Sequence, residues 1–140
     1  MAGDAKTRPT SMDVAAFIAA VPDARRREDA EAACALLAEV SGEPPVMWGP
    51  SIVGFGACRY HYESGREGDA PLVGFSPRKA NLVFYLSCGD AIRGDMLARL
   101  GKHKAGVGCI YVNRLSDIDP AVLRELAVAS ITGLKARYPG

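Results

Sequence analysis

The sequence has no surplus of charge of either sign. Its 140 residues include 17 Lys and Arg and 16 Asp and Glu, which leaves a formal net charge of +1. A protein that binds duplex DNA usually carries a basic surplus, because its affinity comes largely from neutralising phosphates. The chain also has no apolar run approaching the roughly 18 residues of a membrane-spanning helix. We therefore expect neither a nucleic-acid partner nor a membrane partner.

Cysteine and histidine are scarce and are scattered singly along the chain. The four cysteines are Cys34, Cys58, Cys88 and Cys109, and the two histidines are His61 and His103. Structural zinc needs four Cys or His ligands, usually in two close pairs, so this spacing predicts no metal site and no cofactor. The polar segment 1–9 lacks the apolar core of a secretory signal. We therefore expect a cytoplasmic protein whose cysteines are reduced and packed as small apolar residues.

The motifs of several enzyme classes are incomplete. Gly54-Phe55-Gly56 lacks the third glycine of a dinucleotide-binding fingerprint. Gly101-Lys102 is followed by His103, where a phosphate-binding loop has Ser or Thr. A nucleophile elbow needs a final glycine, and the segment 74–78 ends in Arg instead. These absences favour a protein without an assembled catalytic site.

Both ends of the chain show helical patterns. We expect a disordered leader over residues 1–10 and a single domain over 11–140. Thr10 and Asp13 have the spacing of a capping box. They predict the start of a short amphipathic helix, which Pro22 ends.

Two longer helices are predicted, one near each end of the domain. The first runs from about 24 to 40, and Gly42 is a natural cap for its C-terminus. Its first turns hold many charges in i,i+4 pairs such as Arg25 with Asp29, which predicts an exposed, self-compensating face. Asp119-Pro120 is typical of an N-cap followed by proline at the first helical position, so the last helix should begin there.

The middle of the chain is rich in aromatic residues, glycine and proline, which is typical of a β-meander. Apolar and polar residues alternate over 58–63, and further strands are predicted at 72–75 and 81–86. A short helix near 95–100 precedes a later strand at 109–112. We therefore predict an α+β fold. Its antiparallel sheet has about four or five strands, a three-stranded meander plus a later strand, packed against N- and C-terminal helices.

Aromatic and charged residues around the first predicted turn mark the expected ligand site. The glycine-rich loop 64–69 holds Arg66, Glu67 and Asp69, although adjacent charges of opposite sign often form simple ion pairs. Trp48 beside Gly49-Pro50 either stacks on a ligand or covers a core, and Tyr60 lies on the preceding strand. Polar loops on a rigid aromatic scaffold are a common setting for ligand binding.

A second charged loop adds a predicted anion contact. Lys102 and Lys104 flank His103 between two glycines, and cationic neighbours favour the neutral form of that imidazole. The lysines and backbone N–H groups can receive an anion. The alternative is a solvated loop after a helix C-terminus, where lysine is favourable for the helix dipole.

Several short motifs are specific in combination. They are Met47-Trp48-Gly49, Tyr60-His61-Tyr62, Ser64-Gly65-Arg66-Glu67-Gly68-Asp69, Pro71 to Lys79, Leu100-Gly101-Lys102-His103-Lys104, Cys109-Ile110-Tyr111 and Leu115-Ser116-Asp117. On these motifs, over about residues 12 to 132, the chain resembles the YdhG-like family, a domain of unknown function found mostly in bacteria. The resemblance implies an α+β fold and no established activity. Some relatives are described as frataxin-like iron-binding chaperones, which would need an acidic surface.

Three functions are open at this point. The first is a non-enzymatic ligand-binding or accessory module, with an unknown small molecule or protein as partner and a monomeric or homodimeric state. The second, implied by the resemblance, is an intracellular iron-binding chaperone. However, Asp23, Glu28, Asp29 and Glu31 are interleaved with Arg25, Arg26 and Arg27, which makes cation binding by carboxylates less favourable. The third is a small enzyme that uses His103 or Cys58 with a carboxylate such as Glu67.

Overall fold

The computed structural model describes residues 13–49, 51–61, 67–86, 90–106 and 109–137. For residues 59–61, 67, 68, 90–93 and 137 it describes the backbone only. The described part of the chain contains four α-helices, eight strands and a short 3-10 helix. In chain order they are α1 (Val14–Ala19), α2 (Ala24–Ser41), β1 (Pro45–Trp48), β2 (Ile52–Phe55), β3 (Cys58–His61), β4 (Glu67–Ala70), β5 (Val73–Pro77), β6 (Leu82–Tyr85), α3 (Asp90–Leu100), β7 (Lys104–Gly106), β8 (Cys109–Val112), η2 (Leu115–Asp117) and α4 (Pro120–Arg137).

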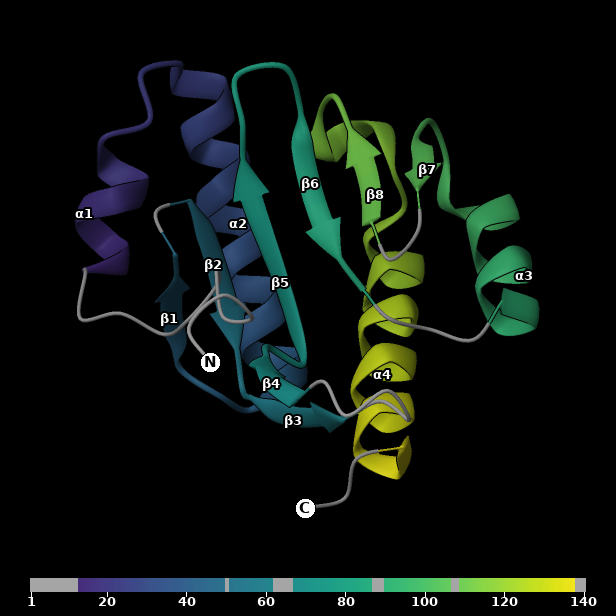
Figure 1. Cartoon of the computed structure of the whole chain (residues 1–140). Helices are drawn as coiled ribbons and strands as arrows, with labels where there is room; N and C mark the ends of the chain where they lie inside the picture. Colours follow the sequence, from purple (N-terminus) through teal and green to yellow (C-terminus); the bar gives the residue numbers. More distant parts are fainter. Residues whose placement is uncertain (1–12, 50, 62–66, 87–89, 107–108, 138–140) are drawn as a thin grey trace.

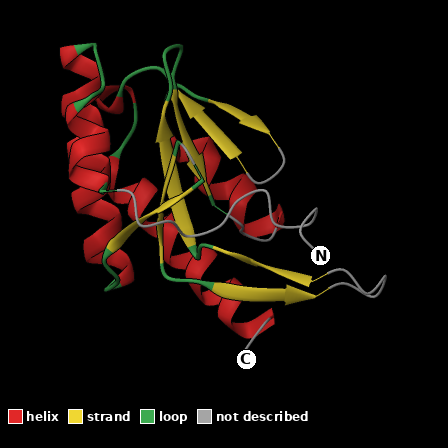
Figure 2. Ribbon diagram, turned by 60° about the vertical axis from the view of Figure 1, so that its left-hand side comes forward, coloured by secondary structure: helices red, strands yellow, loops and turns green. Residues whose placement is uncertain are grey.

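Six strands form one antiparallel sheet in the order β1-β2-β5-β6-β8-β7 (Figure 1). Helices α2 and α4 pack against each other and against β5 on one face of the sheet. Helix α1 lies against α2 and β1 at one edge, and α3 packs on α4 near the other (Figure 1). Strands β3 and β4 form a separate hairpin that projects away from the sheet (Figure 2). The predicted α+β fold, with an antiparallel sheet and helices from both ends of the chain, is confirmed.

The hydrophobic core lies between the sheet and the helices. One row of side chains is in register across five strands and is fully buried: Met47, Val53, Phe75, Phe84 and Ile110. The helices contribute Ala30, Ala33, Leu37, Leu123 and Leu126 from their apolar faces. Burying one large side chain of this kind contributes about 1.5–3 kcal/mol, so this row and the helix stripes hold the two layers together.

The ends of the longer helices follow local sequence signals. The carboxylate of Asp23 caps α2 by accepting a hydrogen bond from the backbone N–H of Arg26 at 3.0 Å. At the other end, Gly42 has a left-handed backbone with φ of +69°. The Asp119 carboxylate accepts from the N–H of Ala121 at 2.9 Å, and α4 begins at Pro120 as predicted. No helix within the described ranges combines the length and apolar character needed to cross a bilayer.

Two predicted helix starts are wrong. Asp13 is itself the N-cap of α1 and accepts from the N–H of Ala15 at 3.2 Å, so it does not lie inside the helix as the capping box required. Thr10, its predicted partner, lies outside the described residues. Helix α3 begins at Asp90, about one turn earlier than the predicted helix at 95–100.

The predicted meander is wrong in its first strand. β3 pairs with β4, and β4 contains Glu67 and Asp69, which the prediction assigned to a loop. β5 pairs instead with β2, a strand that the prediction missed together with β1 and β7. The sheet therefore has six strands, and the predicted strand at 58–63 belongs to the separate hairpin.

The charged start of α2 is not the exposed, self-compensating face that the sequence predicts. Asp29 is 8% exposed and its Oδ2 accepts from Arg114 Nε and from the backbone N–H of Leu115, each at 3.0 Å. Arg26 is equally buried and donates from Nη1 to the carbonyl of Asn113 at 2.6 Å. These residues tie the first turns of α2 to the segment that follows β8.

Candidate functional site

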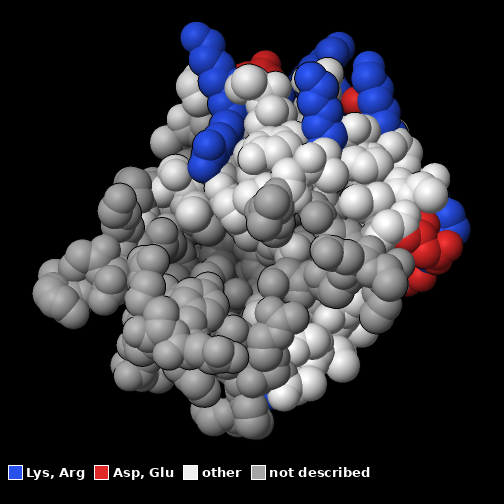
Figure 3. Space-filling model, turned by 45° about the vertical axis from the view of Figure 1, so that its right-hand side comes forward, with Lys and Arg blue, Asp and Glu red and all other residues white. Residues whose placement is uncertain are grey.

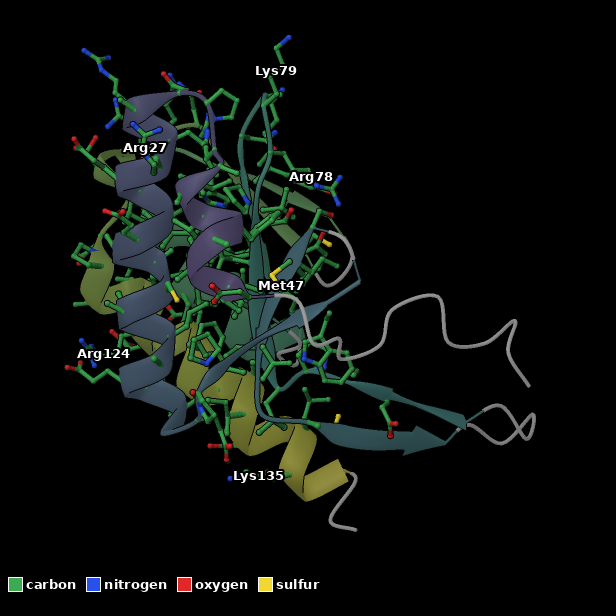
Figure 4. All side chains as sticks on the ribbon, turned by 90° about the vertical axis from the view of Figure 1, so that its left-hand side faces the viewer. Arg27, Met47, Arg78, Lys79, Arg124 and Lys135 are labelled. Atoms are coloured by element: carbon green, nitrogen blue, oxygen red, sulfur yellow. The ribbon has the colours of Figure 1, made fainter. Side chains whose placement is uncertain are left out.

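The second face of the sheet, away from the core, carries a different set of side chains. Successive strand residues point to opposite faces, so the neighbours of the core row turn to this side. Figure 4 shows α1 and α2 on one side of the sheet and the β3–β4 hairpin extending to the other. By register the second face consists of Val46, Trp48, Ile52, Gly54, Gly74, Ser76, Val83, Tyr85, Cys109, Tyr111, Lys104 and Gly106. Aromatic, hydroxyl, thiol and cationic groups are therefore mixed on it, whereas the core face is apolar.

Arg78 and Tyr85 form a hydrogen-bonded pair on this face. Arg78 follows β5, and its Nη2 donates to the Tyr85 hydroxyl oxygen at 2.8 Å. Arg78 is exposed and Tyr85 is half-buried. Burial raises the pKa of the Tyr85 hydroxyl, and the nearby Arg78 opposes that rise only in part. Tyr85 therefore keeps its proton at neutral pH, and the pair presents a guanidinium and a phenol O–H together.

Tyr111 and Lys104 extend this pair toward the β7 edge of the sheet. Tyr111 lies opposite Val83 in the neighbouring strand and is thus diagonal to Tyr85, a spacing of about 7–8 Å in antiparallel sheets. Lys104 lies directly opposite Tyr111. We call Arg78, Tyr85, Tyr111 and Lys104 the tyrosine cluster. In the strand order, Arg78 comes before the two tyrosines and Lys104 comes after them.

Positive charge is concentrated at the end of the molecule that holds Arg78 and the start of β7. Lys and Arg side chains stand at the upper end in Figure 3, where Figure 1 places the β5–β6 turn and the start of β7. Figure 4 shows Lys79 at the tip of that turn and Arg78 pointing away from the helices. The balanced net charge of +1 therefore conceals a local basic surface.

Trp48, a predicted ligand-stacking residue, is packed against the protein and is only 2% exposed. A Cβ added at Gly54 would lie 2.4 Å from Trp48 Cδ1 and 2.8 Å from Pro71 Cβ, so the indole and Pro71 fill the space over this glycine. In the sheet order β1 and β7 are opposite edges, five strand spacings or about 24 Å apart. Trp48 and the predicted anion loop therefore do not line one site.

The predicted residues Lys102 and His103 lie immediately before Lys104, which is itself part of the tyrosine cluster. Lys102 is exposed, and its backbone N–H donates to the Asp117 carbonyl at 3.1 Å. His103 Nδ1 is 2.7 Å from the Gly101 carbonyl oxygen. Because a carbonyl oxygen only accepts, Nδ1 carries the hydrogen, and in the neutral ring Nε2 is left as an acceptor. The predicted loop is shorter than expected because β7 begins at Lys104.

The remaining predicted site residues belong to the hairpin and the segment that joins its strands. Arg66 lies outside the described residues, and only the backbone of Tyr60 and Glu67 is described, in β3 and β4. Asp69 is exposed and lies opposite Arg59 in the strand pairing. Ligand binding by these residues stays a prediction.

Two polar groups on the strands, the Ser76 hydroxyl and the Cys58 thiol, are buried. Ser76 is 1% exposed and its Oγ donates to the Ser51 carbonyl at 2.7 Å. Burial raises the pKa of the Cys58 thiol, and the carboxylate of Asp69 raises it further. Since the thiolate is the reactive form, Cys58 is a weak nucleophile at neutral pH.

Sequence reasoning missed Arg78, Tyr85 and Tyr111 as site residues. The signal was present in the predicted strand 81–86, where Leu82 and Phe84 alternate with Val83 and Tyr85. Such alternation sends one pair to each face. It does not show which face the helices cover.

Comparison with known proteins does not assign the chain to a family. The chain matches no family model, no curated protein and no solved structure. The resemblance to the YdhG-like family therefore stays an expectation from the sequence motifs.

Proposed function

We propose that the protein is a non-enzymatic binding module that holds a small anionic ligand with a flat ring on the second face of its sheet. The observation that carries the proposal is the tyrosine cluster, in which an exposed arginine is bonded to the hydroxyl of a half-buried tyrosine. Lys104 extends the positive charge across the neighbouring strands.

The chemistry of the cluster favours an anion. A guanidinium presents several N–H donors in one plane and matches carboxylate and phosphate oxygens. Arg78 uses Nη2 on Tyr85, which holds the side chain in place while its other N–H groups remain to donate. The phenol of Tyr85, kept neutral by its environment, adds an O–H donor. Tyr85 and Tyr111 also offer ring surface to the flat part of a ligand.

The described side chains do not favour the two alternative functions. Burial raises the pKa of Cys58, which opposes its use as a nucleophile. His103 lies just before β7 at the edge of the large sheet, whereas Glu67, its suggested carboxylate partner, is in the separate β3–β4 hairpin. Within the residues that the structure describes, no group of three or more His, Cys, Asp and Glu side chains is placed to hold a metal ion. Iron binding therefore rests on the YdhG-like resemblance alone. The cytoplasmic location and the oligomeric state stay predictions.

Titration with phenyl phosphate, followed by amide chemical shifts in nuclear magnetic resonance, tests the proposal. We expect saturable shifts centred on β6 and β8 with phenyl phosphate, smaller shifts in these strands with neutral phenol, and none in these strands with benzylammonium. Arg78→Gln should raise the Kd about tenfold or more, because hydrogen bonds to charged groups are worth about 1.5–3 kcal/mol. Tyr85→Phe should raise it about threefold to tenfold, since Arg78 loses its partner, worth roughly 0.5–1.5 kcal/mol.

Arg124→Gln is the matched control, because Arg124 is exposed on α4 and pairs with Glu39 on the helix side of the molecule (Figure 4). It should leave the Kd unchanged. Absence of saturable shifts with phenyl phosphate, or equal losses in Arg78→Gln and Arg124→Gln, would show that the tyrosine cluster is not the binding site.

A further inference from the structure

A groove lies at the β1 edge of the sheet, between α1, α2 and β1. It is an open groove of about 680 Å³, within the range of about 300–1,000 Å³ that small-molecule sites occupy. Figure 4 shows α1 lying alongside α2 at this edge. The described residues that line it are Asp13, Val14, Ala15, Ile18, Glu31, Cys34, Ala35, Ala38, Pro45 and Val46.

The charge on the groove is of one sign. Its described lining contains two carboxylates, Asp13 and Glu31, and neither lysine nor arginine. Both are exposed, and no ion pair joins either of them to another described residue. The position of Asp13 is held by its role as N-cap of α1. The remaining lining is apolar apart from the Cys34 thiol and backbone groups.

Cys34 completes the wall of the groove as a neutral group. It is half-buried on α2, and burial raises the pKa of its thiol. A neutral thiol packs as a small polarisable apolar group and reacts slowly. Because Cys34 lines the groove, a bound ligand covers its thiol and slows its modification. The rate at which Cys34 is labelled therefore reports whether the groove is occupied.

We propose that this groove binds a small organic cation with an apolar body, such as an arylalkyl- or alkylammonium. The apolar lining provides the surface for the body of the ligand, and the carboxylates of Asp13 and Glu31 attract its ammonium group. The site shares no residue with the tyrosine cluster and selects the opposite charge. It is thus independent of the anion-binding function proposed above.

The test uses the full chain and three probes of similar shape: 4-phenylbutylammonium, 4-phenylbutanol and 4-phenylbutanoate. Binding is measured by amide chemical shifts and by the rate at which N-ethylmaleimide modifies Cys34, read from peptide masses. We expect the ammonium to bind most tightly, to shift resonances of α1, α2 and β1, and to slow the labelling of Cys34. The alcohol should bind the groove more weakly, and the carboxylate should neither shift resonances of α1, α2 and β1 nor slow the labelling of Cys34.

Charge-removing variants locate the cationic group. Glu31→Gln should raise the Kd of the ammonium about threefold, in line with an exposed ion pair, and the double variant with Asp13→Asn roughly tenfold. Asparagine retains N-cap ability, so α1 should persist. Glu28→Gln is the control, because Glu28 is exposed on α2 but does not line the groove.

Several outcomes would overturn the proposal. One is equal affinity of the ammonium and the alcohol; another is an unchanged Kd in the double variant. A third is that N-ethylmaleimide modifies Cys34 only after the protein is unfolded. This result would show that the chain itself fills the groove. A dimer that Ala35→Arg converts to a monomer in sedimentation would assign the groove to a second copy. None of these results bears on phenyl phosphate binding, so the two proposals fail separately.

Discussion

Gly54→Ala tests the packing of the second face of the sheet most directly. Gly54 lies in β2 and its φ is not positive, so the backbone accepts alanine without strain. The obstacle is space, because the added Cβ would lie 2.4 Å from Trp48 Cδ1 and 2.8 Å from Pro71 Cβ. Carbon atoms in contact are about 3.5–4.0 Å apart, so the indole must move by about 1 Å or more.

The expected cost follows from two opposing effects. Forcing an extra methyl group into a packed site costs about 1–3 kcal/mol. Replacing glycine by alanine also restricts the unfolded chain, which stabilises the fold by about 0.4–1 kcal/mol. Because the overlap at 2.4 Å is severe, the upper part of the first range applies, about 2–3 kcal/mol. The free energy of unfolding should therefore fall by about 1–2 kcal/mol in Gly54→Ala, with a drop in Tm of roughly 3–8 °C for a chain of this length.

Urea unfolding followed by fluorescence measures this change at the site of the clash, because Trp48 is the sole tryptophan of the chain. The displaced ring should also emit at longer wavelength. Gly94→Ala is the matched control: Gly94 is exposed within α3, and a Cβ there meets nothing within 4 Å. The same chemical change should stabilise the protein there by about 0.5–1 kcal/mol.

A double-mutant cycle with Trp48→Leu, read by circular dichroism, decides whether the indole is the obstacle. With the ring removed, Gly54→Ala should cost at least about 1 kcal/mol less than in the wild-type background. If instead its cost is the same in both backgrounds to within about 0.5 kcal/mol, the placement of Trp48 over Gly54 is refuted.

Three further changes address other parts of the molecule. Gly42→Ala should lower the free energy of unfolding in urea by about 1 kcal/mol, since the C-cap of α2 requires a φ of +69°. Asp29→Asn should lower it by roughly 1–3 kcal/mol, because a buried charged acceptor is lost, whereas Glu28→Gln on the exposed side of α2 should have almost no effect. Burial raises the pKa of the Cys34 and Cys58 thiols in the folded state, so unfolded thiols lose their protons first. Stability in urea should therefore decrease as pH rises above about 8.5, and substituting both cysteines by alanine should reduce that slope.

Helix positions were predictable because their signals are local. Asp23, Gly42 and the Asp119-Pro120 pair act through hydrogen bonds and backbone conformations within one turn of the helix. The start of α1 was misplaced by the same reasoning, because Asp13 fits both the cap and the third helical position of a capping box.

The hydrogen-bond partner of Asp29 could not be predicted from local sequence signals. The spacing of Arg25 and Asp29 suggested a pair on the helix surface, but the bonded arginine is Arg114, 85 residues further along the chain. A sequence shows which charges are close along a helix and not which distant segment packs over them. Tertiary packing therefore decided whether this charge was exposed or buried.

The order of the strands in the sheet could not be predicted from the sequence either. This order decides which predicted site residues lie close together. β1 and β2 are only four residues each, and no strand was predicted in this stretch. Without them Trp48 had no place in the sheet, and its separation from Lys104 by the full width of the sheet was not visible. The alternation in β6 contained the information for Tyr85, but only the position of the helices distinguishes the core face from the second face.

The nearly equal numbers of acidic and basic residues do not exclude charged binding surfaces. A net charge of +1 argues against a uniformly basic protein, yet Arg78 and Lys104 share the second face while Asp13 and Glu31 share the groove at the β1 edge. Exposed charges interact over about 8–10 Å at physiological ionic strength, so the carboxylates at the β1 edge are screened from Lys104 at the β7 edge, about 24 Å away. The tyrosine cluster and the groove can therefore select ligands of opposite charge within one small domain. Raising the salt concentration should weaken anion binding at the tyrosine cluster and cation binding in the groove alike, whereas each charge-removing substitution should affect only its own site.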